Sequence, residues 1–486
     1  MRLLALAVSA LLFACTGTAG SNGGGDGSSG GGSATGGGSA AGGGAGGGAA
    51  VGGGVATGGG SAVGGGAAAG GGSASGGGAA VGGGSATGGG GAIDAGPGCL
   101  TWDAGIGEAT GQTLTLSPGT KLGTVLGNAQ PGDKIVVHGG SYPSESISRT
   151  FTGDVFIEAA AGETPLFHGL SLPDASHLVF RGIHFDDTLS LNNTSYMVFD
   201  QINLVVAAGS SGIELFNSGG GPTHHVKFLR SHIEGGDRTI FFGGSFGMEP
   251  TWNHDFEFRQ NDFVCGTHNC FQFSGGANAI IDDNDFHDPK GDGILTAGGA
   301  HITITRNRMR GDPAVGSTAI ALATPGKEWD NYQDVDYMLS TDITVANNLI
   351  VNWGGNGIAL EALDGVKIVY NTIANCQLGL WTWARSPTGY GSNGPVIIDG
   401  NHNVSLWNNI IPSRQIDSSD PPLLLDSHNI TAPSYVDMTE FVPVMNSAAI
   451  DAALMNADTP TYDRRGSPRT GTPDIGAWEV EAPSCP

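Results

Sequence analysis

A short pattern recurs through the second half of the chain: apolar-x-apolar-x-x-Asn-x-apolar. It returns six times with the asparagine in place, and weaker copies precede these. The six asparagines are Asn261, Asn284, Asn307, Asn348, Asn371 and Asn409, and three of the intervals between them are 23 residues long. A repeat this short buries its apolar face only against neighbouring copies, so the pattern predicts a solenoid.

The residues within each copy indicate β-strands. Apolar and polar residues alternate, β-branched residues are frequent, and glycine separates the copies. Stacked coils about 4.8 Å apart would build one continuous core. An asparagine at the same turn of every coil can hydrogen-bond to the coils above and below, which satisfies a buried polar group. We therefore expect an all-β parallel solenoid.

The first 95 residues cannot contribute to such a core. Residues 1–15 have the form of a secretory signal, with Arg2, an apolar run and a final Leu-Phe-Ala-Cys that resembles the bacterial lipobox. We expect Cys15 to be lipidated, and an ordinary signal cleaved nearby is the alternative. Residues 16–95 are rich in Gly, Ala and Ser and predict a disordered tether with a reach of about 45–50 Å. The protein would then be exported and anchored to the bacterial outer membrane or cell surface.

Charge is concentrated in residues 96–486. The first 95 residues contain only Arg2, Asp26 and Asp94, so the remainder has 20 − 1 = 19 basic and 45 − 2 = 43 acidic residues, a net charge of −24. This field disfavours nucleic acid and anionic membranes. The same negative field repels long polyuronates unless bound calcium or a local patch of basic residues offsets the repulsion. We expect a monomer that meets the membrane only through its lipid anchor and binds polysaccharide.

Two terminal stretches carry a family resemblance. The stretch LGTVLGNAQPGDKIVVHGGSYPSESI (122–147) is similar to the start of the pectate-lyase-like right-handed parallel β-helix proteins. The stretch 449–480, with Asp-Arg-Arg-Gly and Pro-Asp-Ile-Gly-Ala-Trp-Glu, resembles the end of secreted bacterial β-helix proteins of the choice-of-anchor Q kind. The resemblance implies a right-handed β-helix domain over 96–486, with an N-terminal cap helix and a C-terminal capping region at about 412–486. The superfamily contains lyases, hydrolases, epimerases and adhesins, so fold alone assigns no function.

Outward charge that the repeat does not require is concentrated in residues 226–312. Uronate lyases of this fold, as the resemblance implies, use Arg or Lys as a base and a cation that neutralises the sugar carboxylate. The candidate bases or carboxylate clamps are Lys290, Arg306 and Arg308. The candidate oxygen ligands of a Ca²⁺ ion are Asp283, Asp285, Asp288 and Asp292. A ladder of exposed ion pairs, each worth about 0–1 kcal/mol, is the alternative interpretation.

Two further functions remain open. A glycoside hydrolase of the polygalacturonase type needs a pair of carboxylates, which Asp282 or Asp283 against Asp262 or Asp285 would supply. A non-catalytic surface protein would bind glycan through aromatic side chains or only form a stalk. Two tryptophans that alternate on one strand are predicted to face outward, and the insertion 325–340 adds more aromatic residues. The candidate sugar-binding residues are Trp329, Tyr332, Trp381 and Trp383.

One disulfide is expected in the domain. Cys265 and Cys270 bracket a four-residue loop, and export permits a disulfide between them.

The leading hypothesis is a lipid-anchored surface protein that acts on polysaccharide, as a lyase on an acidic glycan. The alternatives are a glycan-binding or structural surface protein and a glycoside hydrolase.

Overall fold

The computed structural model describes residues 100, 104–217, 221–243, 253–324, 339–384, 388–391, 394–397 and 399–480, with backbone alone for the two pieces between 388 and 397. Cys15, the leader and the linker 16–95 lie outside these residues, and so do Trp329 and Tyr332. Residues Gly89–Pro486 form one compact unit, which is the unit described below. Among the described helices, none is long and apolar enough to cross a membrane.

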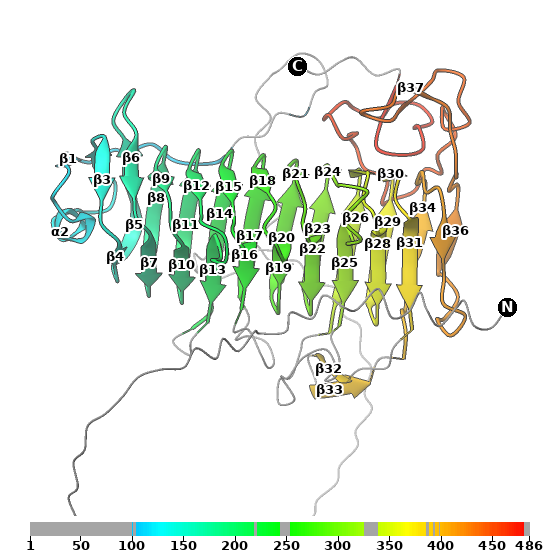
Figure 1. Ribbon diagram of the computed structural model, residues 1–486, viewed down its shortest axis with the longest axis horizontal. Coiled ribbons are helices and arrows are strands. Elements are labelled where there is room, and N and C mark those ends of the chain that lie inside the picture. Colours follow the sequence, from blue (N-terminus) through cyan, green and yellow to red (C-terminus); the bar gives the residue numbers. More distant parts are fainter. Residues whose placement is uncertain are drawn as a thin grey trace, which may run out of the picture. The chain divides into compact units, whose positions relative to one another are not determined.

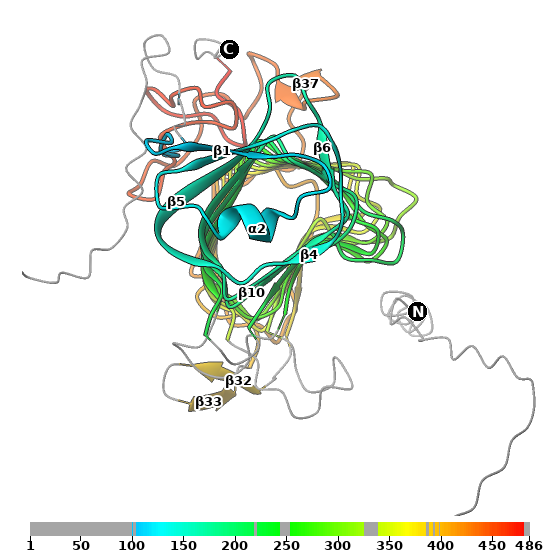
Figure 2. The same cartoon turned by 90° about the vertical axis from the view of Figure 1, so that its left-hand side faces the viewer.

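Three parallel sheets run the length of this unit, with 13, 10 and 11 strands, and we name them sheets A, B and C (Figures 1 and 2). Each complete turn in the middle of the solenoid adds one strand to each sheet, and the turns at the two ends are incomplete. One turn consists of β20 (Ala277–Asp282) in sheet A, β21 (Asp285–His287) in sheet B and β22 (Asp292–Ala297) in sheet C. The chain then returns to sheet A, where β23 (Ala300–Thr305) pairs with β20. The all-β parallel solenoid predicted from the repeat is confirmed.

The strands have these bounds. The other strands of sheet A are β1 (Thr113–Leu116), β2 (Lys134–Val137), β5 (Thr150–Ala159), β8 (Ser176–Arg181), β11 (Ser195–Asp200), β14 (His224–Leu229), β17 (His254–Arg259), β26 (Thr341–Ala346), β29 (Asp364–Val369), β34 (Ser405–Trp407) and β36 (Leu425–Ser427). The others of sheet B are β3 (Gly140–Tyr142), β6 (Pro165–Phe167), β9 (His184–Phe185), β12 (Asn203–Val205), β15 (His232–Glu234), β18 (Asp262–Val264), β24 (Arg308–Arg310), β27 (Leu349–Val351) and β30 (Thr372–Ala374). The others of sheet C are β4 (Glu145–Ser146), β7 (Leu170–Pro173), β10 (Leu189–Asn192), β13 (Ile213–Phe216), β16 (Arg238–Phe242), β19 (Asn269–Phe273), β25 (Ile320–Ala323), β28 (Asn356–Glu361), β31 (Leu378–Trp383) and β35 (Arg414–Gln415). Two small antiparallel pairs stand outside the sheets: β32 (Thr388–Gly391) with β33 (Gly394–Ile397), and β37 (Tyr435–Asp437) with β38 (Val442–Pro443).

The core fills the space between the three sheets. Inward residues of equal position stack from coil to coil, as Phe180, Phe199, Phe228 and Phe258 do with ring centroids 4.7–5.5 Å apart and nearly parallel planes. Burying a side chain of this kind stabilises the fold by about 1.5–3 kcal/mol. Because every coil repeats this burial, the apolar positions of the repeat determine which face of each strand points inward.

The asparagine ladder at the corner between sheets A and B is the polar counterpart of this core. In each step, the backbone N–H and the Nδ2 of one asparagine donate to the Oδ1 of the asparagine on the next coil. For Asn284 and Asn307, these bonds measure 3.0 and 2.9 Å. The ladder ends at Asn429, one coil beyond the six repeats found in the sequence. All its members from Asn261 to Asn409 are buried, so the ladder satisfies polar groups that would otherwise destabilise the core.

A five-residue helix, α2 (Leu122–Leu126), lies across the N-terminal end of the solenoid (Figure 2). Leu122 and Leu126 are buried in the main core. The carboxylate of Glu145 accepts hydrogen bonds from the first N–H groups of the helix, at 2.8 Å from Leu122 and 3.2 Å from Gly123. This satisfies donors that have no partner within the helix.

The last 45 or so described residues do not continue the coils. They pack beside β30 and β34, against the corner between sheets A and B (Figure 1). Arg469 donates to Oδ1 of Asn347 at 2.9 Å, and its guanidinium stands 4.3 Å from the ring centre of Tyr370. The N–H of Ala477 donates to Oγ1 of Thr372 at 2.9 Å. The C-terminal region therefore covers the outward corner of the later coils.

Candidate functional site on sheet B

The strands of sheet B present two rows of side chains to the outside. Each middle strand has three residues, and its central residue is buried, as Phe263 and Phe286 are. The first and third residues of each strand therefore point outward. The first row contains Asn203, His232, Asp262, Asp285 and Arg308; the third-position row contains Glu234, Val264, His287 and Arg310.

Four of these side chains form a continuous chain, which we call the sheet B relay: His232, Asp262, His287 and Asp288. The carboxylate of Asp262 links the two rings, because it lies 2.8 Å from Nδ1 of His232 and 2.8 Å from Nε2 of His287. The other ring nitrogen of His287, Nδ1, lies 2.7 Å from the carboxylate of Asp288. Asp288 is 77% exposed, whereas His287 is only 19% exposed. The relay thus runs from an enclosed imidazole to a carboxylate in solvent.

The surroundings shift the pKa values of two relay members in opposite directions. Burial would raise the pKa of Asp262, but the hydrogen bonds from His232 and His287 outweigh it, and the pKa is lowered. Burial would lower the pKa of His287, but the carboxylates of Asp288 and Asp262 outweigh it, and the pKa is raised. At neutral pH, Asp262 is therefore an anion that orients His287, and the pKa of His287 lies above its ordinary value.

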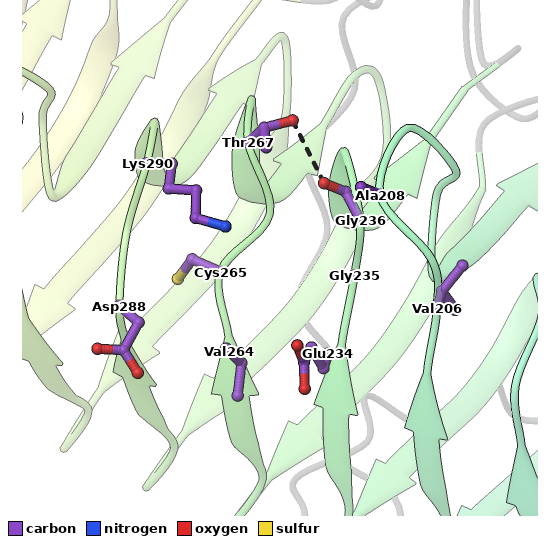
Figure 3. A pocket seen from close by; sticks show the side chains of 10 residues that line it. All are labelled: Val206, Ala208, Glu234, Gly235, Gly236, Val264, Cys265, Thr267, Asp288 and Lys290. Carbon is purple, nitrogen blue, oxygen red and sulfur yellow. Dashed lines mark hydrogen bonds between the residues drawn. The ribbon is translucent and has the colours of Figure 1, made fainter.

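A hollow of about 140 Å³ adjoins the relay (Figure 3). It lies over Val264, a short side chain between the longer Glu234 and His287 in the same row. Its polar lining comes from Glu234, Thr267, Asp288 and Lys290. Figure 3 shows Lys290 reaching from the loop after β21 toward the neighbouring loop of Cys265 and Thr267. Lys290 is exposed, and it makes no ion pair or hydrogen bond with any residue that the structure describes.

The disulfide between Cys265 and Cys270 holds the loop at the floor of this hollow. The loop connects β18 to β19, and the two Cα atoms are 4.2 Å apart. Cys265 is itself part of the hollow's lining. The bond limits how far the floor can move when a ligand enters.

Arg306 has a different environment from Lys290. The carboxylate of Asp282, 3% exposed, lies between Arg259 and Arg306, and we call these three residues the arginine–aspartate cluster. Nε of Arg306 donates to it at 2.9 Å. The repeat predicts that Asp282 faces outward, where it could pair with another carboxylate in a hydrolase. This prediction is wrong, because the side chain is buried and saturated by two guanidinium groups. The same arrangement occurs in an earlier coil, at Arg181, Asp200 and Arg230.

Arg308 and Asp285 are also engaged. Asp285 accepts two hydrogen bonds from Arg310, at 3.1 and 2.8 Å, and lies 3.7 Å from Arg308. Arg308 pairs with Glu440 of the C-terminal region. A substrate carboxylate would have to displace Glu440 to reach Arg308.

The four aspartates considered as cation ligands occupy four different places. Asp283 turns the chain between sheets A and B, with φ = 55°, and burial raises its pKa. Asp285 lies on sheet B, Asp288 lines the hollow, and Asp292 begins β22 in sheet C. Asp292 accepts the N–H of Thr318 at 2.7 Å, and burial raises its pKa to about 6. Among the described residues, none of the four belongs to a group of three metal-binding side chains.

Trp381 and Trp383 lie on sheet C, away from the relay. Leu380 and Thr382 point into the core, so the two tryptophans point outward, as the alternation predicts. Their rings are 5.5 Å apart and both are partly exposed. They form a short aromatic surface beside β28.

Lys290, Asp288 and Asp285 are predicted from the sequence as site residues, but the relay histidines His232 and His287 are not. A signal was present: the repeat aligns His232 with Asp262 one coil apart, in the same outward row. His287 follows Asp285 by two residues and therefore shares its face. The ring contacts themselves depend on side-chain torsions that a repeat alignment does not contain.

The comparisons with known proteins agree with the fold. Residues 246–416 match the family model described as a right-handed β-helix region, which gives the solenoid its hand over that range. No curated protein matches the sequence.

Solved structures with a similar course of the chain have different roles. The PL6 family polysaccharide lyase Pedsa3628 from Pseudopedobacter saltans is 14% identical, with 75% of this chain and 99% of that chain covered and a TM-score of 0.44. The pectate lyase Pel9A is 13% identical, with 77% and 97% covered and a TM-score of 0.38. PfbA, a surface adhesin of Streptococcus pneumoniae, is 11% identical, with 61% and 84% covered and a TM-score of 0.40. At such identities and TM-scores, these likenesses carry no argument about activity.

Proposed function

We propose that this chain is a surface protein that cleaves an acidic polysaccharide by β-elimination, at the hollow on sheet B. One observation carries the proposal: Lys290, an exposed amine without a partner among the described residues, shares a hollow with Asp288, whose carboxylate contacts a histidine of raised pKa, His287. A positive group and an oriented imidazole are two of the parts that β-elimination from a uronate requires. In a domain with a net charge of −24, an amine that no described carboxylate neutralises also marks where a sugar carboxylate is least repelled.

In this proposal, Lys290 pairs with the carboxylate of the sugar and so acidifies the adjacent carbon. Asp288, which is mostly exposed, rotates away and leaves Nδ1 of His287 facing the substrate. Nδ1 takes the proton from the carbon, a C=C bond forms, and the glycosidic C–O bond breaks. The proton then passes from His287 to the departing oxygen, so His287 returns to its starting state. Asp262 stabilises the imidazolium that forms in between.

Calcium has no assigned step in this mechanism. The four aspartates proposed as its ligands are spread over separate places, and Asp285 already binds Arg310. They therefore do not fit a shared protein cage of six to eight oxygen ligands. The assay is run with and without added Ca²⁺, so that a cation bound together with substrate is detected.

The test is incubation of the purified chain with pectate, alginate and glycosaminoglycans, read by the ultraviolet absorbance of the unsaturated product. We expect product from at least one acidic glycan and none from neutral glycans. Lys290→Met is expected to lower turnover about 100-fold or more. Lys227→Met, which removes a lysine of sheet A that pairs with Glu257, serves as the matched control. Absence of product from all substrates, with and without Ca²⁺, would overturn the proposal.

A non-catalytic glycan-binding role has its own supporting observation, the outward pair Trp381 and Trp383. Aromatic faces of this kind can stack on sugar rings through their apolar sides. Binding to a glycan array without turnover, lost in Trp381→Ala, favours this role. Binding that survives the substitution counts against it.

We also propose that the protein is exported and held at the cell surface by a lipid on Cys15, with residues 16–95 as the tether. The lipobox-like sequence before Cys15 and the Gly-rich composition support this. In a bacterial host, Cys15→Ser is expected to move the protein from the membrane fraction to the soluble fraction. Equal membrane association of the two forms would show that the anchor is wrong.

A further inference from the structure

A second group of histidines lies on the same coils as the relay but at another corner of the solenoid. Here the chain passes from sheet C into sheet A. His224 and His225 begin β14, and His254 and Asp255 begin β17 on the next coil. His224 pairs in register with His254, so the two dipeptides are stacked directly one above the other.

The backbone directs these side chains outward. His225 and Asp255 have positive φ angles of 54° and 62°, in the left-handed region that few residues other than glycine adopt. The same position is left-handed in neighbouring coils, at His177, Tyr196, Asn278, His301 and Asp342. His, Asp and Asn tolerate this conformation better than most side chains, which allows a column of ligand-type residues to form here.

The contacts within the group are short. The nearest oxygen of Asp255 lies 2.7 Å from Nδ1 of His254 and 3.5 Å from Nδ1 of His225. Nδ1 of His225 lies 2.7 Å from Nδ1 of His224. The rings of His224 and His254 stack with centroids 5.0 Å apart. Asn278 donates to the second oxygen of Asp255 at 3.0 Å, which holds that carboxylate in place.

The pKa values of the two histidines that begin β14 are lowered. Burial, together with the neighbouring rings of His225 and His254, lowers the pKa of His224 to about 4. Burial also lowers the pKa of His225. The 2.7 Å separation of the Nδ1 atoms of His224 and His225 is that of a hydrogen bond through one shared proton, which a bound metal ion would replace.

We propose that His225, His254 and Asp255 bind one divalent transition-metal ion of the Zn²⁺ type, with His224 placed to join as a fourth ligand. One ligand atom from each of the three residues lies within 4.8 Å of the others. Tetrahedral Zn²⁺ with bonds of about 2.0–2.1 Å places its ligand atoms about 3.3 Å apart, which small side-chain rotations achieve here. Imidazole nitrogen with one carboxylate selects Zn²⁺ and similar ions over Ca²⁺, which prefers oxygen ligands alone. The site lies on sheet A and does not depend on the function proposed for sheet B.

A matched control exists in the same column. His301 and Asp342 also have positive φ angles, and Nδ1 of His301 lies 2.7 Å from the carboxylate of Asp342. This pair has one imidazole instead of three and is more exposed. The His301–Asp342 pair therefore serves as the reference for a surface His–Asp contact with a single imidazole.

The experiment is a Co²⁺ titration of the full chain, purified without a histidine tag and stripped by chelator, followed by absorbance and by calorimetry with Zn²⁺. We expect one ion per chain, spectra of imidazole coordination, displacement of Co²⁺ by Zn²⁺ and no competition from Ca²⁺. His225→Asn, which keeps the left-handed backbone, and His254→Gln are each expected to weaken binding at least tenfold. Asn278→Ala should weaken it about tenfold by freeing Asp255. His301→Asn should leave it unchanged.

Circular dichroism and thermal unfolding establish that each variant is folded before its affinity is compared. No saturable binding by the unaltered chain overturns the proposal. So does equal affinity in His225→Asn and His254→Gln, or a Co²⁺ spectrum that lacks imidazole ligands. The spectrum is measured on the unaltered chain, so this outcome does not depend on whether any variant folds.

Discussion

The arginine–aspartate cluster and the sheet B relay occupy the same coils and use the same kinds of groups, yet their environments differ. In the cluster, Asp282 is 3% exposed and both of its oxygens are bound by guanidinium groups. In the relay, Asp262 is 49% exposed and its partners are imidazoles that can gain or lose a proton. The cluster has no free position for a substrate, whereas the relay ends in solvent beside a hollow. A carboxylate whose oxygens are all bound by arginine therefore indicates a structural role. A carboxylate that contacts a titratable imidazole and is open to solvent is a candidate for a catalytic role.

Removing the central carboxylate of the cluster should have the largest effect of all on folding. Asp282→Ala leaves Arg259 and Arg306 without their shared partner, and breaking a buried ion pair in this way costs about 3–5 kcal/mol. Urea denaturation is expected to show this loss of unfolding free energy. A loss below about 1 kcal/mol would mean that the cluster is no more structural than the relay.

Changing the relay and the hollow should affect turnover and leave stability alone. His287→Gln and Lys290→Met are expected to lower kcat on the cleaved glycan about 100-fold or more, because each removes a group that acts in the transition state. Their unfolding free energies should stay within about 0.5 kcal/mol, as for other partly exposed substitutions. Because the pKa of His287 is raised and its neutral form is the base, the rate should rise with pH through that raised pKa. A pH-independent rate would remove His287 from the proposed mechanism.

Asp292 is intermediate between the arginine–aspartate cluster and the sheet B relay. Its carboxyl group accepts the N–H of Thr318 and contacts no arginine among the described residues. Its folded pKa, about 6, lies above its ordinary value, so folding favours the protonated form. The resulting stability is present below the ordinary pKa and is lost as pH rises to about 6. Asp292→Asn should therefore remove this pH dependence and be more stable than the unaltered chain at pH 7, by up to about 2 kcal/mol. Thermal unfolding at pH 4 and pH 7 measures it, and an unchanged pH dependence in the variant would contradict the expectation.

The smallest effect on folding is expected at the exposed end of the relay. Asp288→Asn removes a carboxylate that is mostly in solvent, so stability should change by less than about 0.5 kcal/mol. The pKa of His287 should nevertheless fall, because Asp288 is one of the two carboxylates that raise it. A histidine-selective NMR titration measures the shift, with His301 as the unaffected reference. An unchanged pKa would mean that Asp262 alone orients and charges the ring.

Much of the fold was predictable because the same hydrogen bonds and apolar contacts recur in every coil. Asn284 and Asn307 recur at equal spacing, and only a stacked solenoid gives every such asparagine the same partners. The inward direction of Ile281 and Phe286 follows from the alternation of each strand. The ladder's last member, Asn429, was not found, because its coil lacks the apolar spacing of the others.

The candidate site was predicted only in part, because it depends on contacts across the repeat. In the sequence, Arg306 and Lys290 are both simply cationic side chains of the same region. In the structure, the buried carboxylate of Asp282 binds Arg306, whereas Lys290 lines the hollow. Arg308 meets Glu440, which is 132 residues away in the chain, and no periodicity relates the two. Asp283 and Asp285 are close in sequence and leave the backbone in different directions.

The repeat is sufficient to predict a parallel β-solenoid with an asparagine ladder, because burial and hydrogen bonding must be satisfied in every coil alike. The sequence also determined which coils carry charge that the repeat does not need. Only the tertiary structure decided which of those charges are neutralised, by Asp282 in the core or Glu440 from the C-terminal region, and which face a hollow. The physical reason is that ionic and proton-transfer roles depend on distances of a few ångströms between side chains of different coils. A one-dimensional pattern contains the stacking order but not those distances.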